Sequence, residues 1–65
     1  MKIRYFEDTD TLYIELKDQV PTQTEELNDN VLLELDSEGK VVGLTIEHVK
    51  RETGKLDFSY ETIAA

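Results

Sequence analysis

The sequence predicts a mainly β protein, a small antiparallel meander of four to five strands with at most one short helical turn. Apolar and polar residues alternate in four short runs, and alternate residues of a strand point to opposite faces of a sheet. Residues typical of turns, namely Asp, Asn and Gly, separate these runs. The alternate apolar residues predict a sheet with one apolar face, which we call the aliphatic face. Its residues are Ile3, Tyr5, Leu12, Ile14, Leu16, Val31, Leu33, Leu35, Val42, Leu44 and Ile46.

The first two strands are expected at residues 2–6 and 11–16. The polar residues 7–10 between them have the length of a hairpin loop. The second run is also rich in β-branched and aromatic residues, which favour strands. We therefore expect these two strands to form a hairpin.

Residues 17–29 are less regular. Pro21 lacks a backbone donor, so any strand at residues 22–24 must lie at a sheet edge. A helical turn at residues 25–27 is an alternative for the end of this stretch. Residues 28–30, Asn-Asp-Asn, predict a turn because these side chains bond back to their own backbone.

A second hairpin is expected from strands at residues 30–36 and 40–47. Asp36 is suited to open a type I turn, and Gly39 to supply the positive φ that returns the chain to the ladder. Gly43 interrupts the second of these strands. A glycine at such a position indicates either a bulge or an aromatic ring lying flat over it.

The C-terminal residues leave two alternatives within what we expect to be one small domain, residues 1–65. Residues 48–52 could form one helical turn, which Gly54 would end. His48 would continue the alternation and finish the preceding strand at the edge of the core. Beyond it, apolar residues alternate again, so that either a fifth strand forms at 55–60 or residues 53–65 are a flexible tail.

We expect the chain to have too few residues to cover both faces of its sheet. A chain of 65 residues without cysteine is near the lower size limit for a self-sufficient core. The C-terminal segment could cover one side of the sheet, either the aliphatic face or a smaller apolar cluster opposite, and the other side would meet solvent or a partner. The candidate interface comprises that opposite cluster and the C-terminal apolar residues: Phe6, Tyr13, Leu32, Val41, Leu56, Phe58 and Tyr60.

The charge is unevenly distributed. The whole net charge of −8 falls on residues 1–47, and residues 48–65 are neutral. An acidic surface repels nucleic acid and anionic membranes and attracts a basic protein. Because the N-terminal residues show no apolar leader and no run is long enough to cross a membrane, we expect a cytoplasmic protein.

Few residues suit chemistry. The acidic loop at residues 7–10 and the turn at residues 36–39 both lack the spacing of a calcium loop. His48 is the only histidine, with no serine or cysteine nucleophile near it in the sequence. We predict no catalytic, cofactor or metal site and expect a protein that is not an enzyme.

Two motifs carry a resemblance to a known family. Asp10-x-Leu12-Tyr13-Ile14, with Tyr5 before it, and Asp36-x-x-Gly39-x-Val41-Val42-Gly43 resemble a family of very short acidic bacterial proteins of unknown function. The similarity covers about residues 3–48. The family has no assigned activity, but its members are thought of as small accessory or antitoxin-like proteins encoded beside another small protein, which the resemblance implies here.

Two functional hypotheses follow. The chain is either a noncatalytic binding module, such as an antitoxin-like acidic partner of a small basic protein, or a homo-oligomer that self-associates for a structural or ligand-binding purpose. The features that point to the first hypothesis are the net charge of −8 confined to residues 1–47 and the apolar face that the chain cannot cover itself.

Overall fold

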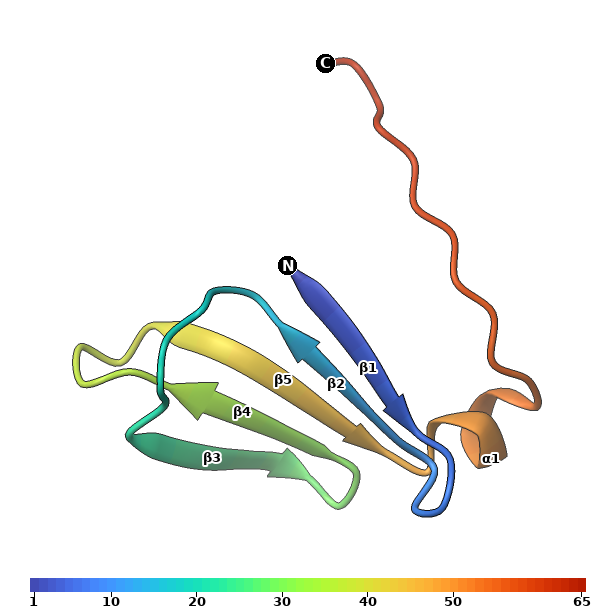
Figure 1. Cartoon of the computed structure of the whole chain (residues 1–65), viewed down its shortest axis with the longest axis horizontal. Coiled ribbons are helices and arrows are strands. Elements are labelled where there is room, and N and C mark those ends of the chain that lie inside the picture. Colours follow the sequence, from blue (N-terminus) through green and yellow to red (C-terminus); the bar gives the residue numbers. More distant parts are fainter.

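A single antiparallel sheet of five strands forms the body of the protein, described for residues 1–65 by a computed structural model (Figure 1). The strands lie in the order β1-β2-β5-β4-β3, and one short helix follows the last strand. The mainly β, antiparallel prediction is confirmed. The elements are β1 (Lys2–Phe6), β2 (Thr11–Glu15), β3 (Gln23–Asn28), β4 (Val31–Leu35), β5 (Val41–Glu47) and α1 (Val49–Thr53).

The strand order departs from a simple meander at one point. The chain leaves β2 and passes the ends of β5 and β4 before it enters β3 at the far edge (Figure 1). This gives strands β2 to β5 a Greek-key arrangement. The amides of Leu16 and Lys17 donate to the carbonyl of Val42, and the Thr22 amide donates to the carbonyl of Leu35. The connection therefore lies against Val42, whose side chain is 0% exposed.

The fifth strand is β3 and not residues 55–60, so the prediction of a strand at 55–60 is wrong. Residues 25–27 belong to β3, so the alternative of a helical turn there is also wrong. The tight turn before β4 explains this result, because Asn28 Oδ1 accepts from the Asn30 amide at 2.8 Å and brings β3 beside β4. Residues 55–60 pair with no strand and belong to the segment after α1. The edge position expected from Pro21 is confirmed.

The hairpin between β4 and β5 forms as predicted. Gly39 has a φ of 81°. Asp36 is buried, and its Oδ1 accepts from the amides of Glu38 and Lys40, both at 2.9 Å. The Nζ of Lys17, on the connection between β2 and β3, donates to Asp36 Oδ2 at 3.0 Å. One carboxylate thus fixes both the turn and the connection beside it.

The register aligns the predicted aliphatic residues across four strands. Cross-strand partners share a face, and two rows result: Ile3, Ile14, Leu44 and Leu33, and then Tyr5, Leu12, Ile46 and Val31. The sheet has one layer, and Leu12 (4% exposed) and Val42 are its only buried hydrophobic residues. The aliphatic face therefore lacks the covering layer on which a sheet normally packs.

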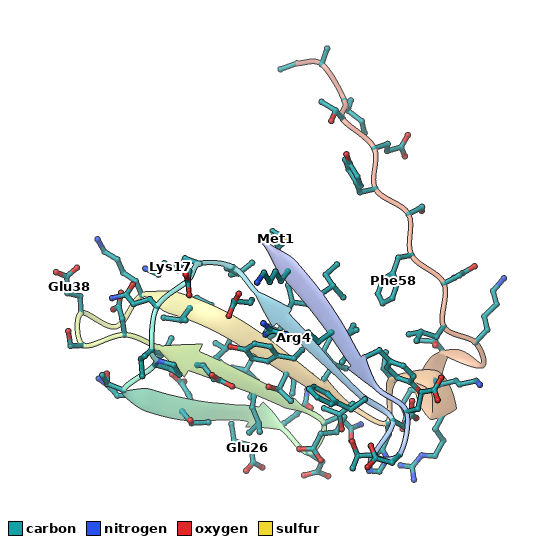
Figure 2. The ribbon with its side chains drawn as sticks, in the orientation of Figure 1. Met1, Arg4, Lys17, Glu26, Glu38 and Phe58 are labelled. Atoms are coloured by element: carbon teal, nitrogen blue, oxygen red, sulfur yellow. The ribbon has the colours of Figure 1, made fainter.

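The tail after α1 does not fold back over the sheet (Figure 1). After α1 the chain leaves the sheet as an extended tail, residues 54–65, with no helix or strand (Figure 1). Figure 2 shows Phe58 on this tail, clear of the strands. Tyr60 is 94% exposed and Leu56 is half-buried. No helix of the chain has both the length and the hydropathy needed to cross a membrane.

Candidate functional site

The aliphatic face is an apolar surface that crosses four strands and has no second layer packed on it. In β1, β2, β4 and β5 the positions of this face carry no charged side chain, and the register adds Glu25 only at the β3 edge, beside Leu33. Ile3 and Leu16 are exposed, and Ile14, Leu33 and Leu44 are half-buried. This surface is suited to contact another apolar surface.

The opposite face is built around an aromatic ring. A Cβ atom on Gly43 would contact the Tyr13 hydroxyl and would lie 2.8 Å from its Cζ and 3.0 Å from its Cε1. The expectation of a ring lying over this glycine is therefore confirmed, and a register shift between Glu34 and Leu35, next to Gly43, adds the expected bulge. Both alternatives occur together at this position.

Tyr13 is tied to polar neighbours on this face. Its hydroxyl donates to Glu34 Oε2 at 3.3 Å, and the Thr45 hydroxyl lies 3.5 Å from Glu34 Oε1. Burial raises the pKa of Tyr13, and the nearby Glu34 carboxylate raises it further. Arg4, labelled in Figure 2, lies 3.7 Å from Glu15 on the same face. The opposite face is therefore polar and aromatic, unlike the aliphatic face.

The structure brings together only some of the predicted interface residues. Tyr13 and Leu32 both pair with Thr45, so they flank it on the opposite face. Phe6 shares that face near its β1 edge and is exposed. Val41 lies beyond the bulge and pairs with Leu35 of the aliphatic set, which separates it from the other three.

The three C-terminal members of the candidate interface lie apart from this cluster. Leu56, Phe58 and Tyr60 belong to the tail, which leaves the sheet beyond α1 (Figure 1). Phe58 and Tyr60 are exposed. In the single chain, the seven residues therefore do not form one continuous surface.

Asp10 anchors the helix to the first hairpin. Its Oδ1 accepts from the Tyr5 hydroxyl at 2.7 Å and from the Lys50 amide at 2.9 Å, and its Oδ2 accepts from the Arg51 amide at 3.0 Å. The Asp10 carbonyl also accepts from the Val49 amide at 3.2 Å. Sequence reasoning missed this role, although the spacing of Tyr5 and Asp10 was part of the family motif and could have signalled it.

The hydrogen bonds of Asp10 shift two pKa values. The bond to Asp10 raises the pKa of Tyr5 to about 12. Burial alone would raise the pKa of Asp10, but the Tyr5 hydroxyl and the amides of Arg51 and Lys50 outweigh it and lower that pKa below its ordinary value. The pair is thus a structural contact between a neutral phenol and a carboxylate.

His48 does not finish the strand as expected. β5 ends at Glu47, and His48 takes a left-handed conformation with a φ of 57°. This conformation is uncommon for a residue with a side chain, and here it turns the chain from β5 into α1. The predicted helical turn is confirmed as α1, which ends at Thr53 and is capped by Gly54.

The surface has no pocket, and no three His, Asp or Glu side chains gather as a metal-binding group. A comparison with protein families matches residues 2–50 to a protein of unknown function family, DUF2283. The chain belongs to the DUF2283 family. No curated protein and no solved structure matches the chain.

The DUF2283 match coincides with the anchored part of the structure. It includes all five strands, Asp10 and the Lys50 amide that Asp10 binds. The tail lies outside it. The similarity thus covers both faces of the sheet and the Asp10–Lys50 part of the contact that holds α1.

Proposed function

We propose that this DUF2283 protein is a noncatalytic protein-binding module whose aliphatic face is covered by another protein chain. The observation that carries the proposal is a one-layer sheet with an uncovered aliphatic face and only Leu12 and Val42 as buried hydrophobic residues. Contiguous apolar patches of several hundred Å² on soluble proteins usually mark interaction sites. The absence of charge from four of the five strands on this face supports an apolar contact.

A second role, as an antitoxin-like acidic partner of a small basic protein, is supported by the charge on the rest of the molecule. Away from the aliphatic face, the exposed edge strand β3 carries Glu26, and Glu34 and Glu47 belong to β4 and β5. Figure 2 shows Glu26 at this edge and Glu38 at the tip of the hairpin. A basic protein would be steered to this acidic surface, which leaves the aliphatic face free for its own contact.

Site-specific photo-crosslinking in cells tests the two roles separately. A photoreactive residue at position 33 probes the aliphatic face, one at position 32 probes the opposite face, and one at Ser37 in the exposed turn is the matched control. We expect position 33 to give an adduct with a protein identified by its cross-linked peptide, and Leu44→Lys to abolish that adduct. The absence of an adduct at position 33 would refute the main proposal. An adduct with a basic protein at position 32 alone would favour the second role.

A further inference from the structure

We infer that the chain covering the aliphatic face is a second copy of this protein, so that two sheets pack face to face about a two-fold axis. This inference rests on the proposed function and names the partner of the same surface. Three features of the molecule support it: the placement of charge, the amount of exposed surface and the position of Leu44.

The placement of charge permits self-association despite a net charge of −8 per chain. Facing sheets pack about 10 Å apart, so charges on the contacting faces would repel strongly. Glu25, in the edge strand β3, is the only charged side chain on the aliphatic face. The remaining acids lie on the outward faces and loops, where salt screens charges separated by more than about 8 Å.

The same placement disfavours a basic partner on this face. A basic protein gains affinity where its cations meet acidic groups, and the central strands offer none on the aliphatic side. An uncharged apolar surface of matching size fits better. The aliphatic face of a second copy is an apolar surface of this size with no charge on its central strands.

The single chain exposes more surface than a typical folded monomer of its mass, and the excess is of the order of one protein interface. The chain exposes 5197 Å² at a mass of 7.5 kDa. A folded monomer of that mass exposes about 4,250 Å² by the usual scaling, so the excess is about 950 Å². The exposed tail, in which Tyr60 is 94% and Ile63 is 81% exposed, and the uncovered sheet both contribute to this excess. A protein interface of standard size removes about 800 Å² from each partner, an area of the same order as the excess.

The position of Leu44 makes the inference specific. β5 is the central strand of five, and Leu44 is the middle residue of β5. A centred, isologous contact between two aliphatic faces places this residue near the two-fold axis, whichever direction the axis takes in the interface plane. Thr45, the next residue, points to the opposite face, where it contacts Glu34.

The test compares Leu44→Lys with the matched control Thr45→Lys by sedimentation equilibrium of the full chain. We expect the wild type and Thr45→Lys to sediment as dimers of twice 7.5 kDa at high micromolar concentration. We expect Leu44→Lys to weaken the dissociation constant by about 100-fold or more, because each dimer would bury two unpaired charges. Circular dichroism shows whether each variant keeps its β structure.

A wild-type mass of one chain at every concentration would overturn the inference. Loss of association in Thr45→Lys but not in Leu44→Lys would overturn it as well, because the opposite face would then be the contact. If Leu44→Lys does not fold, the wild-type urea midpoint decides: it rises with protein concentration in a dimer, and a constant midpoint refutes the dimer. A monomer that still gives a cross-link to a different protein from position 33 would overturn only this inference and leave the proposed function intact.

Discussion

Replacing Gly43 with alanine would place a methyl group where the ring of Tyr13 lies. The new Cβ would be 2.8 Å from Tyr13 Cζ and 3.0 Å from Cε1, closer than carbon atoms pack. The φ of Gly43 is not positive, so alanine can adopt this backbone conformation and the conflict is with the ring alone. We expect the ring to move away and to lose its hydrogen bond to Glu34.

The expected cost combines opposing contributions. Overpacking of this kind costs about 1–3 kcal/mol. Loss of a hydrogen bond further lowers the free energy of unfolding by about 0.5–1.5 kcal/mol, and removal of a glycine from a strand raises it by about 0.5–1 kcal/mol. Because the ring is the end of a movable side chain, we expect a net loss of about 1–2 kcal/mol. For a chain of this size, that loss corresponds to a decrease in melting temperature of about 5–15 °C.

The assay is urea unfolding followed by circular dichroism, at one fixed protein concentration because association would shift the midpoint. The control is the same substitution in a Tyr13→Thr background, where no ring opposes the methyl group. There Gly43→Ala should stabilise the protein by about 0.5–1 kcal/mol, so that its effect changes sign. The same destabilisation in both backgrounds would refute the contact between the ring and the glycine.

Three further predictions concern the anchored carboxylates and the tail. NMR should show Tyr5 as a neutral phenol between pH 10 and its raised pKa of about 12. Because this pKa is higher in the folded state, the stability that the Tyr5 contact contributes is lost as pH rises through that range. Formation of the phenolate near pH 10 would contradict the hydrogen bond to Asp10. The Lys40 amide and then Lys17 lower the pKa of Asp36, so its contribution is present above the ordinary value of 3.8 and is lost as pH falls through the folded value. Asp36→Asn should therefore flatten the acid limb of a plot of stability against pH, whereas an unchanged slope would exclude this carboxylate as its source. Removal of residues 58–65 should leave the urea midpoint unchanged, since Phe58, Tyr60 and Ile63 are exposed, and a lower midpoint would show that the tail packs on the sheet.

The hairpins and the two faces could be predicted because their signals are local. Strict alternation fixes which side chains share a face, and the Asp36 and Gly39 pair specifies a turn within four residues. The ring over Gly43 could also be predicted from the sequence, because a glycine between strand residues leaves space on one face only. These features need no knowledge of which strands are neighbours.

Strand β3 and the strand order could not be predicted in the same way. All residues of β3 are exposed, so it buries no face and shows no alternation. It forms because the turn at residues 28–30 places it beside β4. Residues 55–60 have the opposite character, since they alternate clearly but have no partner strand. Alternation therefore identified four of the five strands, whereas β3 depends on the turn that places it beside β4.

The Asp10 anchor escaped prediction for a related reason. Its partners are backbone amides of Lys50 and Arg51, about forty residues away in sequence. Backbone amides carry no residue-specific signal, so a carboxylate that binds them looks like an ordinary acidic turn residue. Within the candidate site, the sequence indicated an uncovered apolar face, and only the structure showed that the tail leaves it uncovered.

Intermolecular contacts between methyl groups give the most direct measurement of what covers the aliphatic face. An isotope-filtered NOE experiment on an equal mixture of labelled and unlabelled wild-type chains detects only contacts between copies. We expect such contacts among Ile14, Leu33 and Leu44 and none from Leu32 on the opposite face. A well-ordered sample without intermolecular contacts at Leu44, sedimenting as a single chain, would contradict a second copy on this face.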